Sequence, residues 1–227
     1  MTIAALLATG ASLGLFIGLF VSDARAQYYL GGQAGWTGLP YQTDTIDDLA
    51  AIPVGFNAGY NLGVRGGYRL GPWRFEEEHR YRHNNVAEYG EVSVGVNGAR
   101  HTQSILTNVI YDVDIDWPIT PHVGVGIGAM NVSDRLSIPA TGVFLGDSGW
   151  QFGYQAIAGL SYDLNAFLSL DLDYRYVATT ESMFRIPNTN LHYRTGDNTN
   201  NFVASLTYRF APASPIDPPA APAPPSP

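Results

Sequence analysis

Several short segments of the chain place charged side chains at alternate positions. In 73–82 and 167–178, arginines alternate in this way with carboxylates such as Glu76, Glu78 and Asp171. A period of two puts such side chains on one face of a β-strand. An isolated buried ion is costly, so opposite charges on an enclosed face must pair. We therefore predict a network of arginine–carboxylate ion pairs. Its expected members are Arg65, Arg69, Arg74, Glu76, Glu78, Arg80, Asp112, Asp114, Asp171, Asp173, Arg175 and Arg209.

Patterns typical of catalysis or metal binding are weaker. His79 lies two residues from Glu77, but a nucleophile, base and acid arrangement needs a third partner, and none is visible. Asp44, Asp47 and Asp48 could attract a divalent cation. Charged residues in such a stretch are more often a solvated loop. We predict no catalytic residue, no metal site and no cofactor.

The composition excludes several classes of protein. The chain has 227 residues, a formal net charge of −8 and no cysteine, and its 12 basic residues are all arginine. Nucleic-acid binding needs a concentrated basic patch, so it is not expected. Disulfide frameworks and thiolate metal sites are excluded. Charged residues make up 14% of the chain, against about 25% in soluble domains, which indicates that one protein face meets something other than water.

The alternating pattern recurs in eight segments, which we expect to be strands. They lie near 27–37, 56–70, 73–82, 103–115, 121–132, 149–162, 167–178 and 200–210. Long polar connections are expected at 38–55, 83–102, 133–148 and 179–199, and short turns at 71–72, 116–120 and 163–166. Alternating short and long connections are typical of transmembrane barrels, whose short turns lie in the periplasm. Both ends of the strand array would lie on that side.

The apolar face of the expected strands ends in aromatic side chains. A strand protein can span a bilayer only as a closed barrel, because its backbone groups must pair internally. Rings at strand ends suit the membrane interfaces. The expected girdle consists of Trp36, Tyr68, Trp73, Trp150, Tyr162, Tyr176, Tyr208 and Phe210. We predict an all-β fold, an eight-stranded antiparallel up-and-down transmembrane β-barrel.

Some features of the strands leave alternatives open. Periodicity alone also allows a soluble barrel with the opposite faces inside and outside. Glu77 falls on the expected lipid face, where a charge is unfavourable; either a β-bulge shifts the register there or Glu77 lies near an interface. Gly124, Gly126 and Gly128 are not a nucleotide motif, because no helix follows. They are expected to leave lumen space for arginines opposite.

The two ends of the sequence differ from the strand region. Residues 3–21 are an uncharged apolar run, and Ala24-Arg25-Ala26 suits a signal peptidase. We predict a signal peptide over 1–26, the alternative being a retained membrane helix. The barrel is expected over 27–210. Residues 211–227 contain eight prolines and are expected to form a disordered, extended periplasmic tail.

Three segments carry a family resemblance. The last expected strand, Phe202–Phe210, alternates apolar residues and ends in an aromatic one. Leu170–Tyr176 and Arg74–Tyr81 resemble the "LxLxYRY" and "LRxExExRY" strands of the OmpA-like transmembrane domain and of porin-family surface antigens. The resemblance implies a Gram-negative outer-membrane location. It also implies that the barrel-assembly machinery recognises the strand ending at Phe210.

We therefore expect a structural outer-membrane barrel with a plugged, charge-paired lumen. Its surface loops would serve envelope integrity or surface interaction, since binding usually resides in loops. The loop ligand is not readable from the sequence, whereas outer-membrane lipid and lipopolysaccharide are expected partners. A small-solute channel is the first alternative. A lipid A-modifying enzyme is the second, although the His-x-Ser pair of the lipid A deacylases is absent.

Overall fold

The computed structural model describes residues 27–39, 42–46, 50–89, 97–138, 143–180, 182–185 and 192–210. The expected signal peptide (1–26) and the proline-rich tail (211–227) lie outside the described residues.

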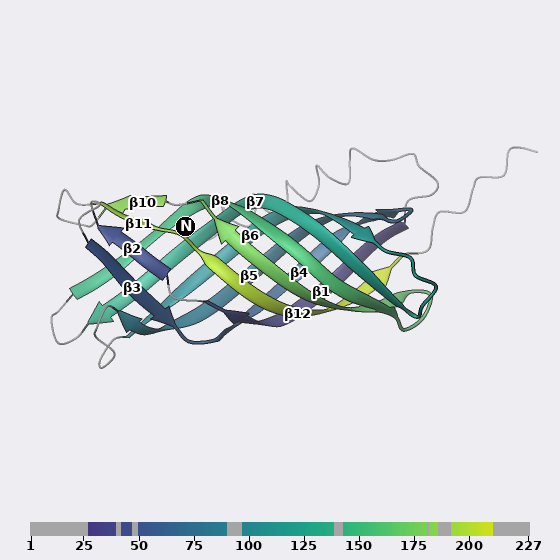
Figure 1. The fold of residues 1–227 in the computed structure, drawn as a ribbon, viewed down its shortest axis with the longest axis horizontal. Helices are drawn as coiled ribbons and strands as arrows, with labels where there is room; N and C mark the ends of the chain where they lie inside the picture. Colours follow the sequence, from purple (N-terminus) through teal and green to yellow (C-terminus); the bar gives the residue numbers. More distant parts are fainter. Residues whose placement is uncertain are drawn as a thin grey trace, which may run out of the picture.

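Eight long strands form a closed antiparallel barrel (Figure 1). They are β1 (Gln27–Gly38), β4 (Gly59–Leu70), β5 (Trp73–Tyr89), β6 (Asn97–Asp112), β7 (Ile119–Ile138), β8 (Val143–Asp163), β9 (Leu168–Thr179) and β12 (Asn198–Arg209). Each pairs with the next in this order, and β12 pairs back onto β1, for example at Ala34 and Ala204. The predicted fold class is confirmed.

Four further strands lie within stretches that the sequence analysis treated as loops. They are β2 (Gln42–Ile46), β3 (Ala50–Phe56), β10 (Ser182–Arg185) and β11 (His192–Thr195). They pair in the order β10-β11-β2-β3 and join the barrel through β5. The prediction of loops was wrong there because these strands depend on pairing between distant segments. The prediction was also too short for four barrel strands. At the end of the barrel where the four added strands lie, these four extend further than expected: β5, β6, β7 and β8.

The short connections all lie at the opposite end of the barrel (Figure 1). Gly71 in the turn between β4 and β5 has φ 59°, a left-handed conformation that favours glycine. The Phe210 backbone N–H donates to the Tyr28 carbonyl at 2.9 Å, so the first and last barrel strands meet at this short-turn end. We call the other end the loop end.

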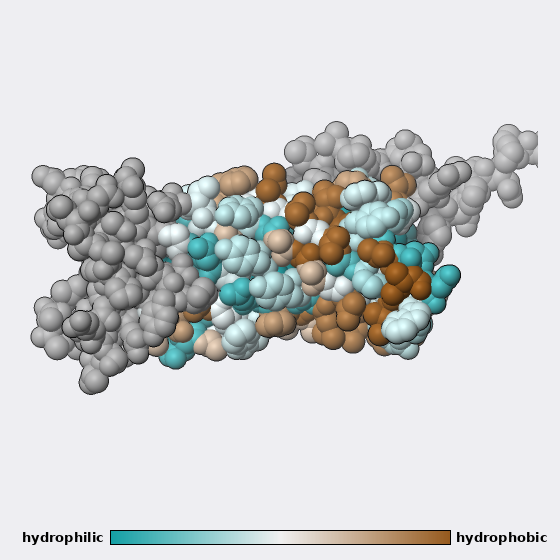
Figure 2. Space-filling view, viewed as in Figure 1, coloured by the Kyte–Doolittle hydropathy of each residue, from teal (hydrophilic) through white to brown (hydrophobic). Residues whose placement is uncertain are grey.

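The two faces of the barrel wall differ in chemistry. Outward side chains on β7 are apolar and accessible, with Val125 63% and Ile127 57% exposed. Inward charged groups such as Glu76 and Arg175 are 0% exposed. Figure 2 shows hydrophobic side chains gathered on the outer wall toward the short-turn end. The barrel is thus apolar outside and ionic inside, the reverse of the soluble alternative. Among the described residues, no helix has the length and hydropathy needed to cross a membrane.

Glu77 follows neither explanation offered from the sequence. Around Glu77, β5 pairs with β4 and β6 without a register shift, opposite Gly66 and Thr107, so no bulge is present there. It also lies midway between Trp73 and Tyr81, away from the strand ends. The Thr107 hydroxyl donates to the Glu77 carboxylate at 2.8 Å, and Glu77 is only 8% exposed. The carboxylate therefore lies against the wall and is hydrogen-bonded.

Candidate functional site: an ion-pair network in the barrel lumen

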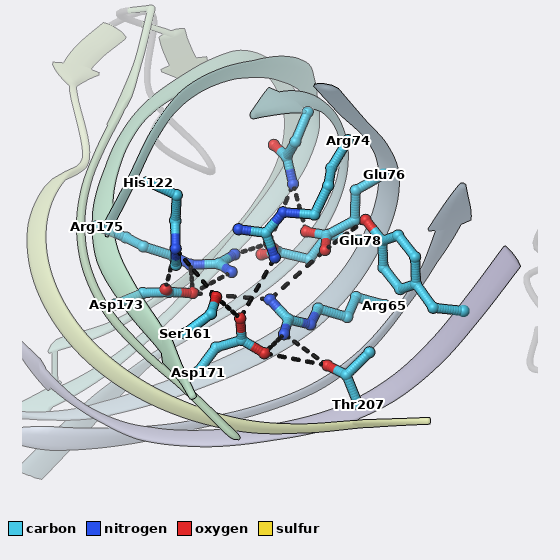
Figure 3. Close-up of polar contacts among 12 residues, drawn as sticks. Arg65, Arg74, Glu76, Glu78, His122, Ser161, Asp171, Asp173, Arg175 and Thr207 are labelled. Atoms are coloured by element: carbon cyan, nitrogen blue, oxygen red, sulfur yellow. Dashed lines mark hydrogen bonds and ion pairs between the residues drawn. The ribbon is translucent and has the colours of Figure 1, made fainter. Parts of the chain in front are cut away.

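The strands β4, β5 and β9 direct alternate charged side chains into the lumen (Figure 3). On β9, the burial pattern alternates so that Asp171, Asp173 and Arg175 are inside while Leu172 and Tyr174 face outward. The local alternation alone therefore brings the charges of three strands into one enclosed space.

Arg65 joins four strands at the centre of this network. Its guanidinium on β4 bonds Asp171 on β9 and donates to the Thr207 hydroxyl on β12 at 2.7 Å. It lies 3.5 Å from Glu76 on β5. Asp173 is a further neighbour at 3.8 Å. All of these side chains except that of Thr207, which is also buried, have at most 1% exposure.

Arg175 forms the second centre. It bonds Glu78 across the lumen and donates to Asp173 Oδ2 at 2.7 Å. Arg80 Nε also forms an ion pair with Glu78 Oε1 at 3.1 Å. Arg80 donates in turn to the Gln155 side-chain oxygen at 3.0 Å. The five groups link β5, β8 and β9 through the interior.

A third set of pairs lies nearer the short-turn end. Arg74 contacts Asp112 at 2.8 Å and Asp171 at 3.3 Å, and Arg69 bonds the same Asp112. Arg69 is the most accessible member, with 31% of its side chain exposed. The five arginines of the three sets face five carboxylates, which balances the buried charge. These are Arg65, Arg69, Arg74, Arg80 and Arg175, with Glu76, Glu78, Asp112, Asp171 and Asp173.

Neutral side chains donate hydrogen bonds to the carboxylates of Glu76 and Glu78. Asn108 donates to Glu76 at 3.1 Å and to Glu78 at 3.3 Å. The Tyr29 hydroxyl donates to Glu76 at 3.3 Å. Asn108 occupies the space opposite Gly126, where an added Cβ would overlap its oxygen. Gly126 thus makes room for this amide, whereas Gly124 lies against Ile110 and Gly128 lies against the backbone of Ile105 and Leu106. The expectation that these glycines leave space for arginines opposite was therefore wrong.

The lumen also holds a serine, a histidine and an aspartate in contact. Ser161 Oγ lies 3.2 Å from His122 Nδ1, and His122 Nε2 lies 2.8 Å from Asp173 Oδ1. This connectivity is like that of a nucleophile, a base and an acid. The Ser161 hydroxyl, however, donates to Asp171. The adjoining cavity is about 20 Å³, close to the size of a single water site. The arrangement therefore anchors two carboxylates and leaves no room for a substrate.

Two residues that were predicted to belong to the ion-pair network lie apart from its buried part. Asp114 is exposed, because β6 ends at Asp112 and the chain then turns. Its carboxylate accepts from the backbone N–H of Asp116 at 3.3 Å within that turn. Arg209 lies at the short-turn mouth and pairs with Asp163, whose side chain is 60% exposed, at 2.9 Å. The prediction was wrong for Asp114 because the strand was taken three residues too far.

A second ionic cluster, which the sequence analysis missed, lies toward the loop end. Arg82 bonds Asp197 and donates to Thr199 at 2.7 Å. Arg100 donates twice to Asp134, each at 2.6 Å. Arg100, Asp134 and Asp197 fell in expected loops. Arg100 and Asp134 lie on the extended parts of β6 and β7, and Asp197 directly precedes β12.

A small apolar layer lies beside Arg80 of the first network and Arg82 of the second cluster. Leu106, Met130 and Val177 form a buried cluster with exposures of 0–2%. Beside it, Met130 and Val177 line a cavity of about 10 Å³ together with Arg80, Arg82 and polar neighbours. The ionic sequence pattern alone gave no sign of this layer.

The predicted aromatic residues fall at both ends of the outer wall. Tyr68, Trp73, Tyr162, Tyr208 and Phe210 lie toward the short-turn end. Trp36, Trp150 and Tyr176 lie toward the loop end. Neighbouring rings contact one another, including some the sequence analysis did not name. Such contacts join Tyr68 to Phe75 (ring centroids 5.1 Å apart), Trp73 to Tyr111 (4.8 Å) and Trp36 to Phe202 (6.1 Å).

Comparisons with known proteins agree with this architecture. An outer membrane protein of Gluconacetobacter diazotrophicus is 32% identical over 165 residues, covering 63% of this chain and 44% of that protein. An uncharacterized Brucella abortus protein is 34% identical over 89 residues, covering 36% of this chain and 31% of that protein. The chain thus spans less than half the length of these relatives.

Solved structures share the fold at low sequence identity. OprG from Pseudomonas aeruginosa gives a TM-score of 0.63 at 14% identity, covering 82% of this chain and 96% of that one. Neisserial surface protein A gives 0.51 at 17% identity, covering 82% and 99%. A family model described as outer membrane protein beta-barrel domain matches residues 3–210. The chain therefore belongs to the outer membrane protein beta-barrel domain family and is a protein of the outer membrane.

Proposed function

We propose that this protein is a structural, non-conducting barrel that holds its long connections at the cell surface. The observation that carries the proposal is the Arg65 guanidinium, which is fully buried and joins β4, β5, β9 and β12 across the lumen. The buried apolar cluster around Met130 also supports the proposal, because it blocks the lumen at a second level. A closed lumen leaves the loop end as the region available for contact with other molecules.

The energetics of the network favour a fixed plug. Each buried arginine has carboxylate partners, and moving one aside would leave uncompensated charge at a cost of several kcal/mol. The described cavities of about 20 Å³ and 10 Å³ are each near the size of one water site. A water-filled path would require both the ionic and the apolar layers to separate.

Planar-bilayer recording tests this proposal against the small-solute channel. The protein is inserted at known stoichiometry beside a porin that serves as a positive control. We expect no steady open current from the wild type or from Arg209→Ala, which leaves the lumen intact. A steady, reproducible open state of the wild-type barrel would overturn the proposal and favour the channel.

We propose no enzymatic activity for the barrel. The Ser161 hydroxyl is bonded to Asp171 and buried, so a lipid cannot reach it. Mass spectrometry of lipid A from cells with and without the protein tests this directly. Identical lipid A profiles are expected, and a protein-dependent loss or gain of an acyl chain would contradict the assignment.

We also infer the partners of the wall and of the last strand. Lipid and lipopolysaccharide suit the outer wall, where Leu62, Val64 and Val125 are more than half exposed. Phe210 is 47% exposed and packs edge-on against Tyr208, so it is available for recognition by the barrel-assembly machinery. Phe210→Ala should reduce the fraction of folded barrel in cells, measured by heat-modifiable gel migration. An unchanged folded fraction would contradict that role.

A further inference from the structure

Two histidines face each other on the outer wall near the loop end. His83 on β5 and His101 on β6 are direct cross-strand partners. Both are partly exposed, and their side chains point away from the lumen, as does that of Tyr81. The histidines are eighteen positions apart in the sequence, so only the register between the strands reveals the pair.

The polar atoms of this group converge on one point. His83 Nδ1 lies 3.1 Å from His101 Nδ1, and the Tyr81 hydroxyl lies 2.6 Å from the same His101 nitrogen. The Tyr60 ring packs beside His83 with centroids 5.4 Å apart. Strand pairing and ring packing therefore hold two imidazole nitrogens and a phenol oxygen within reach of a single bound atom.

We propose that His83 and His101, with Tyr81 beside them, bind a transition-metal ion. Imidazole nitrogen binds zinc at about 2.0–2.1 Å. Two nitrogens 3.1 Å apart then subtend about 98° at a shared ion. That angle lies between about 90° for tetragonal copper or nickel and about 109° for tetrahedral zinc. The pair can thus chelate such an ion with little movement.

The donor set also indicates which cations are excluded. Among the described residues, no group of three or more histidine, cysteine or carboxylate side chains gathers around an ion. The site therefore offers two imidazole nitrogens and one phenol oxygen. Calcium and magnesium prefer oxygen ligands with carboxylates, whereas imidazole suits copper, zinc and nickel. Water or a headgroup oxygen would complete the coordination of the partly exposed site.

His79 provides a matched control on the same strand and face. It lies two residues before Tyr81, and its cross-strand neighbours are Val64 and Ile105, not another histidine. A single imidazole there cannot chelate. His79→Ala consequently removes an outward histidine without altering the proposed site.

The test uses untagged full-length protein refolded in detergent micelles, because a histidine tag would bind the metal itself. Copper(II) titration followed by electron paramagnetic resonance should show one ion per barrel with two nitrogen ligands. We expect His83→Ala and His101→Ala each to weaken binding by about tenfold or more, with His79→Ala unchanged. Calcium should not compete. The proposal would be overturned if His83→Ala and His101→Ala bound copper(II) as tightly as the wild type. It would also be overturned if His79→Ala lost as much copper affinity as they do.

A second measurement requires no variant. Zinc should protect the wild-type histidines at positions 83 and 101 from diethylpyrocarbonate, as read by mass spectrometry of the digested protein, while His79 is modified at the same rate. Equal modification of all three with and without zinc would refute the site. Heat-modifiable migration verifies that each sample is folded.

Discussion

Replacing Arg65 with alanine removes a buried cation that contacts three other strands, β5, β9 and β12. Asp171 and Glu76 would remain buried with part of their compensating charge gone. Removing one partner of a buried ion pair costs about 3–5 kcal/mol. Arg74 still contacts Asp171, so the lower part of this range is expected. With a denaturant slope of about 2 kcal/mol per molar, the urea midpoint should fall by about 1.5–2 M.

The assay is equilibrium unfolding in lipid vesicles, followed by tryptophan fluorescence and by heat-modifiable migration. Arg209→Ala is the matched control, because its partner Asp163 is 60% exposed and an exposed pair is worth about 0–1 kcal/mol. Arg65→Lys should recover only part of the loss, since an ammonium cannot reproduce the spread of guanidinium donors. If Arg65→Ala and Arg209→Ala unfold at the same midpoint, the network does not stabilise the barrel as described.

Three further substitutions test other layers by the same unfolding assay. Gly126→Val should reduce the folded fraction on heat-modifiable gels, because its side chain would overlap Asn108; normal folding would contradict the close packing. Met130→Ala should lower the free energy of unfolding by about 2–5 kcal/mol through a cavity in the apolar layer, whereas a change below about 0.5 kcal/mol would show a loosely filled lumen. Val125→Arg, on the outer wall, should cost about 2–4 kcal/mol in a bilayer, and no cost there would argue against lipid contact.

Much of the barrel follows from local alternation. The period of two assigned each side of β9 correctly, with Asp171 and Asp173 inside and Leu172 outside. In a strand, successive side chains point to opposite faces, so the sequence of neighbouring residues is enough to assign each side chain to a face. The number of barrel strands and the short turns follow from the same pattern. The same alternation also predicts that most of the charged residues of the network face the lumen.

The features that were missed depend on contacts between distant segments. Asp114 was assigned to the lumen because alternation continues past Asp112, where the chain turns. The strands in the connections pair with one another and with β5, which no local pattern shows. Likewise, the apposition of His83 and His101 depends on the register between β5 and β6.

The central claim, a barrel apolar outside and filled inside, is tested most directly at two neighbouring residues of β12. The chain has no cysteine, so single cysteines at Ala204, which faces outward, and at Ser205, which is 1% exposed in the lumen, report on the two faces. In folded protein in vesicles, a nitroxide at position 204 should collide with oxygen but not with a water-soluble nickel complex. The thiol at 205 should resist water-soluble reagents until the barrel is unfolded. Rapid aqueous labelling at 205, or nickel access at 204, would contradict the account.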